Sequence, residues 1–140
     1  MSEDGFQKLI ETAKTARLQS VAPFSNFLVG AAVKTQAGKV YTGCNVESAS
    51  YGLTVCAERV AIWKALSEGE REFTELAIVA DTESLTPPCG TCRQIIHEFC
   101  KNATIVLSNL RGETQTCSIK ELLPRAFDAR FLSGAKKESA

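Results

Sequence analysis

The sequence lacks a net charge and has few aromatic residues. Its 16 basic and 16 acidic residues cancel, and Phe, Tyr and Trp make up 7% of 140 residues. A balanced charge gives no long-range positive field to concentrate nucleic-acid backbones, and few aromatics leave little for stacking successive bases. A small, weakly charged substrate therefore fits better than a polynucleotide.

No apolar stretch approaches the length needed to span a membrane. The first residues, Met1 to Gly5, are acidic, whereas a secretory signal has basic residues and then an apolar run. We expect a cytoplasmic protein with no membrane partner. Its six cysteines should then be reduced, so that a C-x-x-C pair favours metal or redox chemistry over disulfides.

With 140 residues and 44% hydrophobic content, the chain should form one domain over residues 1–140. Residues 133–140 contain nothing to pack and should be a frayed tail.

Hydrophobic periodicity, turn residues and breakers predict helices that alternate with strands. The run Leu76–Ala80 is almost wholly apolar, as in a strand covered by helices on both faces. The predicted fold class is α/β, a three-layer α/β/α sandwich with a mixed central sheet and a hairpin at one end. The predicted helices are 3–19, 55–68, 89–100 and 119–123, and the predicted strands are 27–33, 39–42, 76–80, 104–108 and 114–117.

Two short motifs carry the chemistry. Cys56-Ala57-Glu58 is followed, 33 residues after its cysteine, by Pro88-Cys89-Gly90-Thr91-Cys92. Three thiolates leave a tetrahedral zinc with one open position, as hydrolytic chemistry requires. Zinc-dependent nucleobase deaminases have this arrangement, with His or Cys as first ligand and Glu as general acid and base. We therefore predict Cys56, Cys89 and Cys92 as ligands of one zinc ion and Glu58 as the catalytic proton carrier.

The spacing also predicts where the metal lies. Cys56 and Glu58 would point about 200° apart on a regular helix, so they can share a site only beyond its N-terminal end. Cys89 and Cys92 lie on one face of the next helix's first turn. Two positive helix ends would help to keep the thiols deprotonated. Because three thiolates bound to a zinc dication give the site a net negative charge, we expect the Arg59 guanidinium to donate hydrogen bonds to the ligand sulfurs.

Each of these residues also has a simpler interpretation. Glu58 alone could be an exposed first-turn carboxylate that complements the helix dipole. Free cysteines are commonly small buried apolar residues, and this is our interpretation of Cys44, Cys100 and Cys117. His97 turns away from the face of Cys92 and is interpreted as a surface or core histidine.

These motifs, with Gly43-Cys44-Asn45-Val46-Glu47 and Cys89-Gly90-Thr91-Cys92-Arg93-Gln94, resemble the small homotetrameric cytidine deaminases over about residues 23–127. The resemblance implies that Asn45 and Glu47 hold the ribose hydroxyls, a role that suits an amide and a carboxylate two residues apart on extended chain. A polar strand end is the alternative. Asn45-Val46-Glu47 differs from the related blasticidin deaminases, which lack this glutamate.

The resemblance implies further substrate contacts. Phe27 would stack on the pyrimidine, unless it is an ordinary core residue of a strand. Ala57 is also predicted to contact the substrate. Tyr51 would lie near the 5′ side of the ribose, and Phe127 would reach into a neighbouring subunit's site. Phe24 stands where many relatives have Tyr, so a hydrogen bond from that hydroxyl is absent.

The predicted function is hydrolytic deamination of cytidine and deoxycytidine to uridine and deoxyuridine, in pyrimidine salvage, with one zinc ion per subunit of a homotetramer. Two alternatives are a structural zinc module, with Cys44 or Cys100 as fourth ligand, and a cytosine deaminase acting on single-stranded polynucleotides.

Overall fold

The computed structural model describes residues 2–132, so the predicted tail at 133–140 lies outside the described residues. Its helices are α1 (Ser2–Arg17), η1 (a 3-10 turn, Tyr51–Leu53), α2 (Ala57–Ser67), α3 (Gly90–Phe99) and α4 (Ile119–Leu122). Its strands are β1 (Val29–Thr35), β2 (Val40–Cys44), β3 (Phe73–Ala80), β4 (Thr104–Ser108) and β5 (Thr114–Cys117).

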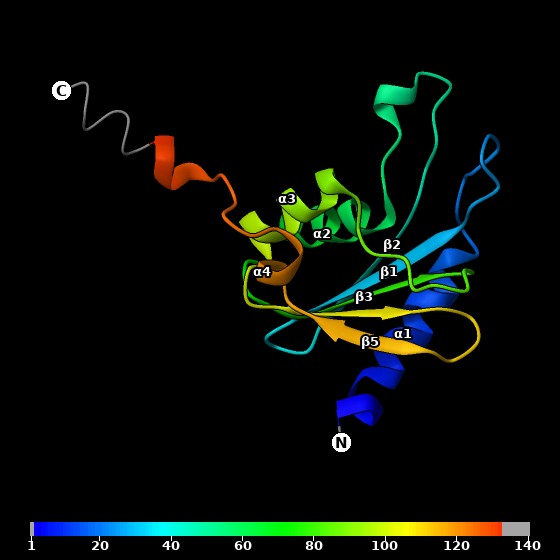
Figure 1. Cartoon of the computed structure of the whole chain (residues 1–140), viewed down its shortest axis with the longest axis horizontal. Helices are drawn as coiled ribbons and strands as arrows, with labels where there is room; N and C mark the ends of the chain where they lie inside the picture. Colours follow the sequence, from blue (N-terminus) through cyan, green and yellow to red (C-terminus); the bar gives the residue numbers. More distant parts are fainter. Residues whose placement is uncertain (1, 133–140) are drawn as a thin grey trace.

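The strands form one mixed sheet in the order β2-β1-β3-β4-β5. β1 pairs antiparallel with both β2 and β3, β3 and β4 are parallel, and β5 returns antiparallel to β4. Helix α1 packs on one face of this sheet, while α2 and α3 lie on the other (Figure 1). The predicted three-layer α/β/α sandwich with a mixed sheet is therefore confirmed.

Alternating side chains of the central strands supply two separate cores. Ala77 and Val79 of β3 face α1, where they pack with Leu9, Ile10 and Ala13. Leu76 and Ile78 face the other way and join the larger core beneath α2 and α3. This two-sided burial explains the continuous apolar run in β3, since both faces of a covered strand lie in a hydrophobic environment.

Helix α2 approaches β2 unusually closely at Gly43. A Cβ atom at this position would lie 2.4 Å from the carbonyl oxygen of Ala57 and 2.5 Å from the amide of Ala61. Only glycine allows this contact without a shift of the backbone. The contact fixes the start of α2, and with it Cys56, against the sheet.

The largest departures from the predicted strand boundaries are at β3 and β1. β3 begins at Phe73, before the apolar run, because Phe73 and Glu75 pair with β1 residues Thr35 and Lys34. β1 begins at Val29 and leaves Phe27 in the preceding loop, where its carbonyl accepts a hydrogen bond from the Asn45 side chain. The turn η1 was not predicted from the sequence. Within residues 2–132, no helix combines the length and the apolar character that crossing a membrane requires.

Candidate active site

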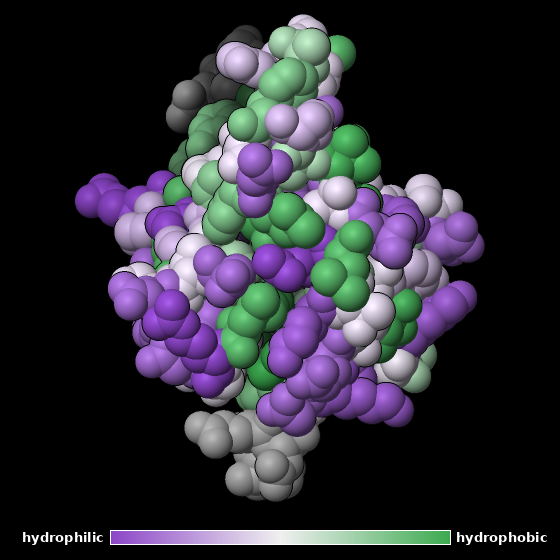
Figure 2. All heavy atoms as spheres, turned by 90° about the vertical axis from the view of Figure 1, so that its right-hand side faces the viewer, coloured by the Kyte–Doolittle hydropathy of each residue, from purple (hydrophilic) through white to green (hydrophobic). Residues whose placement is uncertain are grey.

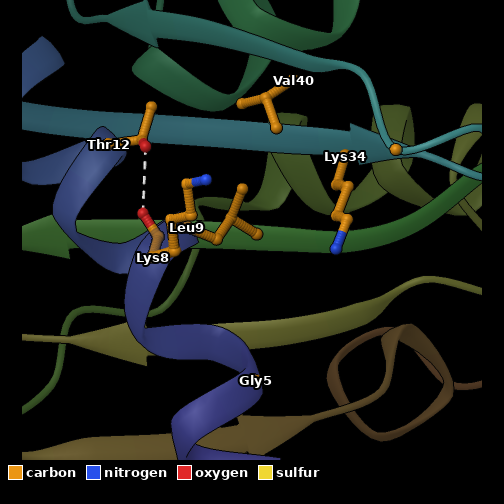
Figure 3. A pocket seen from close by; sticks show the side chains of 7 residues that line it. Gly5, Lys8, Leu9, Thr12, Lys34 and Val40 are labelled. Atoms are coloured by element: carbon orange, nitrogen blue, oxygen red, sulfur yellow. Dashed lines mark hydrogen bonds between the residues drawn. The ribbon is translucent and has the colours of Figure 1, made fainter.

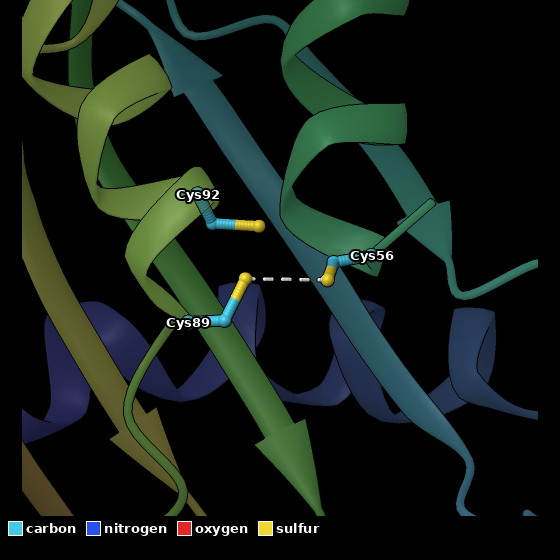
Figure 4. Close-up of side chains that lie close together, drawn as sticks. All are labelled: Cys56, Cys89 and Cys92. Carbon is cyan, nitrogen blue, oxygen red and sulfur yellow. Dashed lines mark hydrogen bonds between the residues drawn. The ribbon is translucent and has the colours of Figure 1, made fainter. Parts of the chain in front are cut away.

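Three cysteine sulfurs meet between the starts of α2 and α3 (Figure 4). Cys56 is the N-cap residue of α2, Cys89 is the N-cap of α3, and Cys92 lies in the first turn of α3. Their Sγ atoms all lie within 4.8 Å of one another, and those of Cys56 and Cys89 are 3.6 Å apart. Tetrahedral zinc with Zn–S bonds of about 2.3 Å places its sulfurs about 3.8 Å apart. The sulfur positions thus fit a zinc ion, and they lie at the two helix N-termini where the sequence predicts the metal site.

A guanidinium lies beside this cluster. Nη2 of Arg59 is 3.8 Å from the Cys56 sulfur and 3.3 Å from the carbonyl oxygen of Thr54. Hydrogen bonds from the thiol of Cys92 and from Arg59 lower the pKa of Cys56 to about 5, against the opposing effect of burial. The cation therefore favours the thiolate form that a metal requires.

Glu58 is enclosed beside the sulfurs. Its residue is 4% exposed, so it is not the solvent-exposed first-turn carboxylate of the simpler interpretation. Burial raises the pKa of its carboxyl to about 7. A carboxyl with a pKa near neutrality can both accept and donate a proton, as general acid and base catalysis requires.

A cavity of about 170 Å³ opens between these groups and the loops above the sheet. The predicted site residues among its lining are Phe27, Asn45, Cys56, Ala57, Glu58 and Cys89. Most of the surrounding side chains are apolar, which suits a flat heterocycle with a few fixed polar contacts. The sequence did not single out Val29, Ile78, Thr86 and Pro87, which also line the cavity. Of these four, only Pro87 could have been suspected from the sequence, because it lies two residues before the predicted ligand Cys89.

Asn45 and Glu47 occupy different parts of the site. Asn45 is 8% exposed and uses both ends of its amide on the loop opposite: Oδ1 accepts from the amide of Val29 at 2.9 Å, and Nδ2 donates to the carbonyl of Phe27 at 2.7 Å. Glu47 lies in an adjoining hollow of about 250 Å³, shared with Phe24, Tyr51 and Thr54. Thr54 lines both spaces, so the two compartments adjoin at this residue.

Tyr51 and Phe127 are more peripheral. Tyr51 is 77% exposed and lies edge-on to Phe24, with ring centroids 6.1 Å apart. Phe127 is 60% exposed, stacks on Phe131 and does not line the cavity of its own chain. Figure 2, which views the side at the right of Figure 1, shows several apolar residues on the upper part of the molecule. The roles predicted for Tyr51 and Phe127 remain predictions.

The remaining cysteines and His97 lie elsewhere. Among the described residues, the metal-binding group contains none of Cys44, Cys100 and Cys117. Cys100 is buried at the far end of α3, as predicted, and burial raises the pKa of its thiol to about 12, whereas Cys44 and Cys117 are half-buried. His97 is not near the sulfurs but lies 2.9 Å from the carboxylate of Asp128.

A second hollow, of about 200 Å³, lies on the opposite side of the sheet between α1 and the β1–β2 hairpin (Figure 3). Lys8 and Thr12 of α1 and Lys34 of β1 contribute to its lining. None of the predicted site residues reaches it.

Comparison with known proteins agrees with this geometry. Residues 4–108 match the family model of the cytidine and deoxycytidylate deaminase zinc-binding region. The chain belongs to this deaminase family. A cytidine deaminase of Sporosarcina psychrophila is 47% identical over 133 residues, covering 94% of this chain and 98% of its own. One from Halalkalibacterium halodurans is 50% identical over 128 residues, covering 91% and 97%.

The deaminase family also matches in three dimensions. The crystal structure of cytidine deaminase from Burkholderia pseudomallei superposes with a TM-score of 0.84 at 50% identity, covering 86% of this chain and 97% of that chain. The family's zinc-binding region and the three converging thiols together confirm zinc as the cofactor. A closed four-thiolate module is not supported, because Cys44 and Cys100 are outside the sulfur cluster.

Proposed function

We propose that this deaminase converts cytidine and deoxycytidine to uridine and deoxyuridine with release of ammonia. One observation carries the proposal: the three thiols and the buried carboxyl of Glu58 line or adjoin one cavity, whose other polar lining comes from residues that suit a nucleoside. The high identity to cytidine deaminases over almost the whole chain supports the same substrate.

The zinc held by Cys56, Cys89 and Cys92 would supply an activated water molecule when bound. Glu58 would then carry two protons in turn: its carboxylate accepts one from the water and delivers it to a ring nitrogen, then accepts the second from the hydroxyl formed at C4 and delivers it to the amine, which leaves as ammonia. Enclosure of Glu58 supports this role, since a buried carboxyl exchanges protons with the substrate more readily than with bulk water. Arg59 holds the Cys56 thiolate and offsets the negative charge of the ligand set.

The two compartments correspond to the two parts of a nucleoside. We assign the base to the cavity beside Glu58, with Phe27 against the ring and Ala57 in the wall. The sugar would lie toward Thr54 and Glu47, with Tyr51 near its 5′ side. Asn45 keeps one amide hydrogen and one lone pair free beyond its two backbone contacts, so it can still bind a hydroxyl.

We further propose that the chain forms a single domain and assembles as a homotetramer in which Phe127 completes a neighbouring site. The strong exposure of Phe127, Phe131 and Leu132 supports a contact between copies, since such apolar side chains are commonly covered in an assembly. The six free thiols support a cytoplasmic location, and we place the deamination there in pyrimidine salvage.

Purified protein incubated with cytidine tests the activity. We expect the ultraviolet spectrum to change to that of uridine, with one ammonia released per uridine formed. A matched sample stripped of zinc by a chelator should be inactive and should recover when zinc is restored. Intact cytidine in the zinc-loaded sample would contradict the proposal.

A polynucleotide substrate is the second candidate to be tested. No Lys or Arg lines either compartment within residues 2–132, whereas a single-strand channel tracks the backbone with cations. We expect a single-stranded oligonucleotide to leave the rate on free cytidine unchanged. Deamination of the oligonucleotide in preference to cytidine would favour the alternative.

A further inference from the structure

The loop that carries Phe27 and the carboxylate of Glu47 are joined by one hydroxyl, that of Ser25. Its Oγ donates to Oε2 of Glu47 and accepts a hydrogen bond from the amide of Phe27 at 3.0 Å. The two substrate-binding candidates are twenty residues apart in the chain. The Ser25 side chain therefore bridges the two, beside backbone amides of the same loop that also bond to Glu47.

The hydrogen bonds of Glu47 show what this contact leaves free. Oε1 accepts from the amides of Phe24 and Ser25, at 3.0 and 3.2 Å, and Oε2 accepts from the Ser25 hydroxyl. A carboxylate has about four lone-pair sites. With three used, one site on Oε2 remains, and it can accept one hydroxyl of a ligand.

The backbone of the loop supports the same arrangement. Asn26, between Ser25 and Phe27, has a φ of 56°, in the left-handed region, and its amide donates to the carbonyl of Ala22 at 3.0 Å. This reversal brings the Ser25 hydroxyl back over the amide of Phe27. Hydrogen bonding from Ser25 also lowers the pKa of Glu47, so the carboxylate stays ionised.

We propose that Ser25 is a positioning residue for nucleoside specificity: its hydroxyl orients Glu47 so that the remaining lone pair meets a sugar hydroxyl, while it holds Phe27 against the base. This inference rests on the proposed function, because it requires Glu47 to bind the sugar. It predicts that loss of the hydroxyl weakens recognition of the sugar more than recognition of the base.

Ser25→Ala tests this with two substrates, cytidine and 2′,3′-dideoxycytidine, which lacks the hydroxyls that Glu47 could bind. We expect kcat/KM for cytidine to fall about tenfold, mainly through KM, as is typical for loss of a hydrogen bond to a charged group. For the dideoxy substrate the fall should be less than about threefold on the same reasoning. Ser25→Thr, which keeps the hydroxyl, should restore the ratio, and Ser67→Ala on the distant end of α2 is the matched control.

The double variant Ser25→Ala with Glu47→Gln separates positioning from a general loss of structure. If Ser25 acts through Glu47, removing it in the Glu47→Gln protein should hardly change the ratio between the two substrates. An equal loss on both substrates, or an unchanged ratio in Ser25→Ala, would overturn the proposal.

Binding of the products gives a readout without turnover. Calorimetry with uridine and 2′,3′-dideoxyuridine should show a weaker Kd for uridine alone in Ser25→Ala. If the wild-type protein binds uridine but does not deaminate cytidine, the proposed reaction fails and this binding difference still decides the role of Ser25. If it binds neither nucleoside, both proposals fail.

Discussion

Replacement of Arg59 by glutamine tests how the protein tolerates three thiolates on one metal. Arg59 lies 3.8 Å from the Cys56 sulfur, and at an effective dielectric constant of about 20 two unit charges at that distance attract by ~4 kcal/mol. This is an upper limit, because desolvation and side-chain ordering oppose it. Groups that hydrogen-bond to metal ligands typically contribute 10- to 100-fold in metal affinity or activity, about 1.4 to 2.8 kcal/mol.

We therefore expect Arg59→Gln to bind zinc or turn over cytidine about 10- to 100-fold less well. Glutamine can still donate to the carbonyl of Thr54 but carries no charge, whereas Arg59→Lys keeps the charge and should lose less. Competition with a chromophoric chelator measures the zinc affinity, and steady-state kinetics on the zinc-loaded protein measures kcat.

A control isolates the charge from packing. The guanidinium lies over the ring of Trp63, 5.7 Å from its centroid, so Trp63→Leu removes this support but leaves the contact with sulfur. Its effect on zinc should be smaller than that of Arg59→Gln. Zinc affinity and kcat both within about twofold of wild type in Arg59→Gln would refute the electrostatic role, because the expected loss is at least about tenfold.

Four further outcomes follow from the geometry. Glu58→Gln should retain zinc but lose about 10²- to 10⁴-fold in kcat, and near-normal turnover would remove Glu58 as the proton carrier. Cys100→Ala should keep one zinc per chain, measured by atomic absorption, since this thiol lies outside the sulfur cluster; loss of the metal would revive a four-thiolate site. Gly43→Ala should lower the free energy of unfolding by about 1 to 3 kcal/mol in urea titrations, because its Cβ would lie 2.4 Å from the Ala57 carbonyl, and an unchanged midpoint would show that α2 can shift freely. Removal of zinc by a chelator should lower the thermal midpoint, because the metal binds the folded state preferentially; an unchanged midpoint would uncouple the metal from the stability of the fold.

The layers of the fold were predictable because each element carries its own local signal. The apolar run of β3 indicated burial on both faces, and the two cores that flank Ala77 and Ile78 confirm it. The start of β3 at Phe73 was not predictable, since its first residues include the polar Thr74 and Glu75, and Glu75 joins the sheet through pairing with Lys34 of β1 and Thr104 of β4. The turn η1 likewise has no periodic signal.

The candidate site divides in the same way. Cys56, Glu58, Cys89 and Cys92 could be placed together from the signature of zinc-dependent nucleobase deaminases and from helix geometry, which leaves few positions where they can meet. The sequence could not predict that Asn45 and Glu47 lie in different compartments, because residues two apart on an extended chain are expected on the same side of it. Asn45 is held in the cavity by the loop at Phe27, and Glu47 is held outside it by Ser25. Those partners are distant in sequence, and no local pattern identifies them.

The metal ligands also bear on the stability of the helices that present them. N-cap positions favour Ser, Thr, Asp or Asn, whose side chains bond to free amides of the first turn. Ser118 does this at the start of α4, in a capping box with Glu121. Cys56 and Cys89 occupy the same position, with extended backbone dihedral angles, yet neither side chain caps its helix. An uncapped start typically costs about 1 kcal/mol, so α2 and α3 begin less stably than helices whose N-cap side chain bonds to the first turn. Zinc bound between them would offset this cost and join the two helix starts, which links the stability of this side of the sheet to the presence of the metal.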